Sequence, residues 1–221
     1  MNFGDQKTLT AEYLDDPNNS RHTSAALMLY LNRAQGDIKR HIDEANETFF
    51  QKTDTATVVA GDDDFLHTLP ADFSKLVSVE DTSNSIPLQS TPTTFQDRHD
   101  SIRVDKRFLP KGAHSSGGYY LKHDHDLGRF RLGFTSPDSG YTVSILYQSN
   151  LDDMTVNADV SRVPSDYHDL MCLMAALRGY AIEQQRFPAG LESLRQEQLM
   201  QLRNYVEAIG RQQPTYINVQ D

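Results

Sequence analysis

The stretch VPSDYHDLMCLMAALRGYAIEQQRF, residues 163–187, predicts one long amphipathic helix around which the rest of the chain is organised. Pro164 suits a first helical turn, because its missing N–H costs nothing there, and Ser165 offers a capping oxygen. Apolar residues then recur at steps of three and four, so they form one stripe along the helix. The stripe consists of Tyr167, Leu170, Met171, Met174, Leu177 and Ala181. Further apolar residues widen it, and we therefore expect this helix to be buried on more than one side.

A second helix is predicted directly after the first. The residues Phe-Pro-Ala-Gly at 187–190 end the first pattern, since proline and glycine interrupt helices. Apolar residues at helical spacing resume over residues 191–209. The chain is thus predicted to contain a helical hairpin of residues 164–187 and 191–209.

Another amphipathic helix is predicted over residues 24–48. Thr23 or Ser24 can cap it, and apolar residues from Leu27 onward keep helical spacing. Gly36 lies in its interior, where glycine costs about 1 kcal/mol relative to alanine, a cost that the helix tolerates or uses for close packing. The apolar stripe of each of the three helices needs a partner, so we expect them to pack together.

The two ends of the chain are predicted to be arms. Residues 1–22 are polar and contain the turn-rich segment LDDPNNS, which indicates a flexible arm that is ordered only by contact. Residues 211–221 follow Gly210, a helix stop, and contain three apolar residues that alternate like an edge strand. These three residues are Tyr216, Ile217 and Val219. We expect them to dock in an assembly; the alternative is a frayed end without a partner.

The middle of the chain changes to the alternating pattern of β-strands. The alternation is clearest over residues 129–134 and 141–148, where one face of a sheet must be buried. Residues 73–80 and 86–88 predict a hairpin with a turn between them. Further strands are predicted at 56–60, 65–69 and 119–122, a short helix at about 91–100, and a strand or a loop at 102–109.

The order of these elements predicts an α+β fold. A helical bundle over residues 23–50 and 161–210 carries an inserted, mainly antiparallel β domain over residues 51–160. The arms are residues 1–22 and 211–221.

Composition narrows the class of protein. The 221 residues include 21 Lys plus Arg against 31 Asp plus Glu, a formal net charge of −10, which argues against general electrostatic binding of nucleic acid. The sequence has no apolar run near the length of a membrane span and no secretion signal at its start. Its only cysteine, Cys172, excludes an intrachain disulfide and fits a reducing compartment.

The charge is distributed unevenly. Two acidic clusters are present, at residues 62–64 and at residues 152–153. A basic patch consists of Arg98, Arg103, Lys106, Arg107 and Lys111. These clusters are either solvated loops or opposite surfaces that meet between copies of the protein.

The most specific motifs for catalytic and ligand-binding sites are absent from the sequence. It contains no phosphate-binding loop, dinucleotide fingerprint, nucleophile elbow or cysteine-based zinc pattern. The segment His-Asp-His-Asp at 123–126 offers metal-capable groups, but no further ligand is identified. His168 lies near Ser165 and Asp169, yet neighbouring helix positions point in different directions and do not build a catalytic triad. We therefore expect neither an enzyme nor a bound cofactor or metal.

Two segments, one at residues 67–80 and one at residues 163–181, carry a resemblance to a known family. They resemble the head-to-tail adaptor proteins of tailed bacteriophages, also called connector, neck or head-completion proteins. HTLPADFSKLVSVE, residues 67–80, is similar to the segment in which Leu-Pro-x-Asp-Phe leads into a strand in these adaptors. VPSDYHDLMCLMAALRGYA, residues 163–181, is similar to the start of their long helix. The resemblance covers most of the chain from Thr23 to Gly210 and includes the order of helix, β insertion and helices. The large β insertion is a departure from the shorter, nearly all-helical adaptors.

This resemblance implies a structural protein of the virion. It implies a homo-oligomeric ring, usually a dodecamer, that lies beneath the portal protein and presents a docking surface to tail or nozzle proteins. Viral DNA passes through such a ring without sequence-specific binding, and the family has no catalytic residues. The implied location is the neck of the virion, after assembly in the cytoplasm of the host bacterium.

Other functions remain open at this point. Another neck or tail protein of a phage is the first alternative, and a β-rich ligand-binding module or hydrolase is the second. For the segment at 211–221 we expect contact with the portal or with a neighbouring copy.

Overall fold

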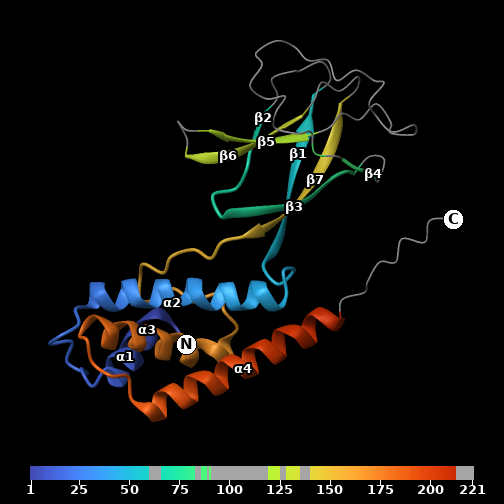
Figure 1. Ribbon diagram of the computed structural model, residues 1–221. Coiled ribbons are helices and arrows are strands. Elements are labelled where there is room, and N and C mark those ends of the chain that lie inside the picture. The colour runs from blue at the N-terminus through green and yellow to red at the C-terminus, as the bar shows by residue number, and fades with distance from the viewer. Residues whose placement is uncertain are drawn as a thin grey trace. The chain divides into compact units, whose positions relative to one another are not determined.

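The computed structural model describes residues 1–59, 66–82, 86–88, 90, 119–124, 128–134 and 140–212 (Figure 1). The chain divides into two compact units. One consists of Met1–Phe50 with the chain from Leu151 onward, and the other of Gln51–Asn150. The helices and the antiparallel sheets confirm the predicted α+β class.

Helix α2, Ser24–Ala45, begins where its capping residue predicts. The backbone N–H of Ala26 donates to the Thr23 side chain (3.2 Å). The helix ends at Ala45, three residues before the predicted end at 48. The next residue, Asn46, is extended, and its side chain accepts hydrogen bonds from the N–H and the hydroxyl of Thr48. One face of α2 is fully buried, including Leu31, Ala34 and Ile38.

Helix α3, His168–Ile182, packs against α1, α2 and α4 and is the centre of the helical unit. A 3₁₀ turn, Ser165–Tyr167, precedes it, and Ser165 makes no capping bond to the helix. The predicted end at residue 187 is wrong. Gln184 adopts a left-handed conformation (φ 55°), after which the N–H of Gln185 donates to the carbonyl of Tyr180 (2.9 Å). A glycine would have signalled this stop, whereas glutamine does not.

The prediction of a flexible arm over residues 1–22 is wrong. Phe3–Tyr13 form helix α1, which starts with a capping box between Asn2 and Asp5. Phe3 and Leu14 are fully buried in the helical core. The N–H of Phe3 also donates to the carbonyl of Asp159 (2.8 Å), so the start of the chain is tied into the unit.

The loop after α1 is held by one carboxylate. Asp16 accepts hydrogen bonds from the N–H groups of Ser20 (2.8 Å), Arg21 (2.9 Å) and His22 (2.8 Å). Burial of Asp16 opposes its ionisation, but these hydrogen bonds and one from the Ser20 hydroxyl outweigh it and hold its pKa below the ordinary value. The segment that looked like a solvated turn is therefore a fixed connection.

Helix α4, Ala189–Gln212, is longer at both ends than the predicted 191–209. Leu202 and Val206 attach it to the core of the helical unit. The ring of Tyr205 lies 5.7 Å from that of Tyr167, and Gln198 donates to Asp169 (2.8 Å). No helix in the described part of the chain combines the length and apolar character that crossing a membrane requires.

The other unit contains two antiparallel sheets. The first has the order β1-β7-β3-β4, and the second has the order β2-β6-β5. The strands are β1 Gln51–Val58, β2 Leu66–Thr68, β3 Phe73–Asp81, β4 Ile86–Pro87, β5 Tyr119–Asp124, β6 Arg129–Phe134 and β7 Tyr141–Ser149. The predicted hairpin is confirmed, since Asp81 of β3 pairs with Ile86 of β4.

Buried side chains of the β unit form a hydrophobic core of their own. The apolar residues of β7 alternate in sequence because every second residue faces this core. Tyr141, Val143, Ile145 and Tyr147 of β7 are all buried, as predicted. In β6, Leu132 and Phe134 are buried, whereas Phe130 is exposed on one side while its ring contacts that of Phe73 (5.6 Å). The predicted helix near 91–100 and the segment at 102–109 lie outside the described residues.

Candidate interaction surfaces

The residues proposed from the sequence as contact sites fall in parts of the chain that the structure does not describe. These are the basic patch, Arg98, Arg103, Lys106, Arg107 and Lys111, the acidic residues 62–64, and the C-terminal residues Tyr216, Ile217 and Val219. Their roles remain predictions. The acidic residues Asp152 and Asp153 are described, and both are exposed.

Two of the four residues of the His-Asp-His-Asp segment are described, and both contact neighbours on the adjacent strand. The ring of His123 meets that of Phe130 edge-on (5.0 Å), and Asp124 pairs with the Arg131 guanidinium (3.1 Å). Within the described ranges no three His, Cys, Asp or Glu side chains are grouped as a metal site would require. His123 and Asp124 therefore act in the β5–β6 pairing.

The residues at the start of α3 do not converge on a reactive site. His168 is buried and its Nε2 donates to the carbonyl of Val163 (2.9 Å), while Ser165 Oγ contacts Asp166 (3.3 Å). Asp169 instead accepts hydrogen bonds from Tyr13 (2.5 Å) and Gln198. These polar groups connect α3 to α1 and α4.

The thiol of Cys172 is not accessible for reaction. It is fully buried, and its thiol lies 3.5 Å from the carbonyl oxygen of Gln6. Burial raises the pKa of the thiol to about 12, so the nucleophilic thiolate is scarce near neutral pH. The cysteine therefore fills space in the core.

Most residues of helix α4 are exposed or only partly buried. Over residues 189–210 only Leu202 and Val206 are buried. Met200 is 66% exposed although it is a large apolar side chain. A helix with so little burial within its own chain is available for contact with another molecule.

A shallow groove lies between α2 and α4. Its volume is about 350 Å³. Its lining residues are His41, Glu44, Ala45, Leu199, Met200 and Arg203. The lining combines an acidic and a basic residue, Glu44 and Arg203, with three apolar side chains. This mixture suits a protein surface rather than a small apolar ligand.

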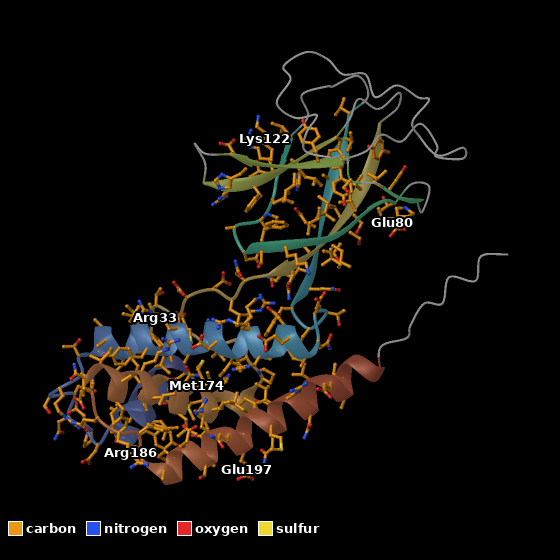
Figure 2. The ribbon with its side chains drawn as sticks, in the orientation of Figure 1. Arg33, Glu80, Lys122, Met174, Arg186 and Glu197 are labelled. Carbon is orange, nitrogen blue, oxygen red and sulfur yellow. The ribbon has the colours of Figure 1, made fainter. Side chains whose placement is uncertain are left out.

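Helix α2 also presents an exposed face, and Leu29 on it is 47% exposed. Arg33 on the same face makes no hydrogen bond or ion pair to any other residue that the structure describes, whereas Arg40 pairs with Asp37 (3.0 Å). Figure 2 shows Arg33 on the outer side of α2, Glu197 on the outer side of α4, and Met174 between these helices. The two exposed faces thus lie on opposite sides of the helical unit.

Sequence reasoning missed the contribution of α1. Its buried face contains Gln6 and Thr10, whose hydroxyl donates to the carbonyl of Gln6 (2.7 Å), so the hydrophobic stripe is interrupted by polar residues. The available signal was the spacing of Asn2 and Asp5, which is typical of a capped helix start.

These features define an α+β protein with a helical unit, a β unit and broad exposed helix faces. The model of the SU10 adaptor protein family matches residues 1–217, and the chain belongs to this family. Membership supports the class that the resemblance predicts, a phage adaptor with a structural role. Comparison with curated proteins gives no match.

Proposed function

We propose that this chain is the head-to-tail adaptor of a tailed bacteriophage. Its copies form a dodecameric ring beneath the portal and give tail or nozzle proteins their docking surface. The family match over residues 1–217 carries the proposal. The protein is assembled in the host cytoplasm and lies in the neck of the virion, and its role is structural.

The charge of the chain supports this role. A formal net charge of −10 disfavours binding to the DNA backbone, so DNA can pass through a ring without being retained. The basic patch of residues 98–111 meets acidic loops of the adjacent copy, for which the exposed Asp152 and Asp153 are candidates.

The division of the chain into two units supports a separate role for each unit. The β unit, Gln51–Asn150, is an insertion between α2 and the α3–α4 hairpin, and each unit has its own hydrophobic core. The helical unit builds the ring, and the inserted β domain contacts other neck or tail components. The C-terminal residues Tyr216, Ile217 and Val219 contact the portal or a neighbouring copy.

Native mass spectrometry and negative-stain electron microscopy test the proposal. The purified chain is measured alone and after mixing with portal rings. A closed ring of uniform stoichiometry in either sample supports the adaptor. A monomer in both samples, with no mass added to the portal, contradicts it and favours a different neck protein or a ligand-binding module.

A further inference from the structure

The interior of α2 contains a glycine, Gly36, and no contact within the described part of the chain requires a glycine there. Gly36 is exposed, and no atom lies within 4 Å of the place where its Cβ would be. Glycine weakens a helix interior, and close packing within the chain, which is the usual compensation, is absent at this position among the described residues. The missing side chain instead leaves room for a second molecule.

Gly36 belongs to a continuous outer stripe of α2. Its members follow one another at helical spacing on the side opposite the buried face. The α2 stripe consists of Ala25, Leu29, Arg33, Gly36 and Arg40. Both of its charged residues are basic, and Leu29 adds an exposed apolar side chain.

Helix α4 carries a matching outer stripe, opposite Leu202 and Val206. The α4 stripe consists of Ser193, Glu197, Met200, Asn204 and Ala208, all of them exposed. Met200 lies at the edge of this stripe, because it also lines the groove between α2 and α4. Glu197 is its only charged residue, and although Gln201 donates to it (3.1 Å), no cation contacts it within the described part of the chain. Small and uncharged residues are unusual on a helix face that only meets water.

The order of residues in the two stripes is complementary. Leu29 and Arg33 lie one turn apart on α2, and Met200 and Glu197 lie one turn apart on α4 in the opposite order along the chain. An antiparallel crossing therefore places Leu29 against Met200 and Arg33 against Glu197 at the same time. The small residue Ser193 then faces Gly36, where the helices approach most closely.

We propose that the α2 stripe of one copy packs antiparallel against the α4 stripe of the next copy. This contact rests on the proposed function and specifies the surfaces that build the ring. The two stripes are different, and Figure 2 shows Arg33 and Glu197 on opposite sides of the unit. The contact is therefore heterologous and continues from copy to copy.

Disulfide cross-linking tests this contact directly. Leu29→Cys and Met200→Cys are made singly and together; the native Cys172 is fully buried and serves as a silent background. Under mild oxidation each single variant should stay uncross-linked, their mixture should give dimers only, and the double variant should give a ladder of multimers. Dimers from one single variant alone would indicate a symmetric contact and overturn the proposal.

Charge reversal gives an independent readout. Arg33→Glu and Glu197→Arg should each reduce assembly at least tenfold, and the double variant should recover most of it. Arg186→Glu, an exposed arginine outside both stripes, is the matched control and should assemble like wild type. Failure of the double reversal to restore assembly, with folded protein in every sample, would contradict the pairing.

Different results would exclude the stripe contact and the adaptor function. If wild-type protein forms rings but the mixture of cysteine variants gives no dimer, the stripes are not the contact and the adaptor function stands. If wild-type protein forms no ring alone or on portal, the adaptor proposal falls, and this contact falls with it.

Discussion

Helices α3 and α4 each have an apolar stripe in sequence, but the two helices have very different surroundings. Nine of the 15 residues of α3 are buried, whereas α4 has 24 residues and buries only Leu202 and Val206 over residues 189–210. The difference indicates that α3 supplies the stability of the helical unit, while the outer face of α4 is free for contacts with other molecules. Substitutions of the same kind in the two helices should therefore have unequal effects.

The largest effect is expected from Met174→Asp in α3. Met174 is buried in the helical core, so the substitution removes apolar packing and buries a charge without a partner, at a cost of about 4 kcal/mol or more. Met200→Asp in α4 is the control and should leave the melting temperature nearly unchanged. A Met174→Asp protein that melts like wild type would contradict the central position of α3.

Leucine truncation sharpens the comparison. Leu170 in α3 and Leu202 in α4 are both buried in the same core. Leu170→Ala should cost about 4 kcal/mol, and Leu202→Ala about 2 kcal/mol, because α4 can move to close the cavity while α3 is held on several sides. Urea unfolding measures both values, and equal losses would show that α4 is as constrained as α3.

Two glycines test packing within the unit against packing outside it. A Cβ on Gly179 of α3 would lie 2.6 Å from the side chain of the buried Leu14, so Gly179→Ala should cost about 1 to 2 kcal/mol. Gly36→Ala meets no atom in its own chain and should stabilise the monomer by about 1 kcal/mol. The same Gly36→Ala change should weaken assembly; increased stability with undiminished assembly would remove the case for close approach there.

The smallest effect on stability is expected from deletion of residues 213–221. If this segment serves docking, the melting temperature of the monomer should change by less than the equivalent of about 0.5 kcal/mol, while binding to portal rings should fall. Portal binding equal to that of the full chain would show that Tyr216, Ile217 and Val219 have another role.

Sequence alone predicted the elements whose signals are local. The Thr23 cap sets the start of α2, and strict alternation predicted β7 because every second residue faces the core. The end of α3 was missed because Gln184 adopts the conformation that glycine normally signals. Helix α1 was missed because Gln6 and Thr10 occupy its buried face.

Properties that depend on distant parts of the chain were not accessible from sequence. The pairing of β7 with both β1 and β3 joins strands separated by most of the β unit, and no local pattern specifies such partners. The exposure of α4 was equally hidden, because Leu191, Leu194 and Leu199 look like core residues but are only partly buried. The contact stripes on α2 and α4 could be recognised only once the buried faces were known.

Hydrogen–deuterium exchange of monomer and ring tests the division between α3 and α4 most directly. In the monomer, amides of α3 should be strongly protected and those of α4 should exchange faster, because few buried contacts hold α4 in place. On assembly, protection should rise in α4 and along α2 and stay unchanged in α3. Protection of α4 equal to that of α3 in the monomer, with no change on assembly, would contradict the account.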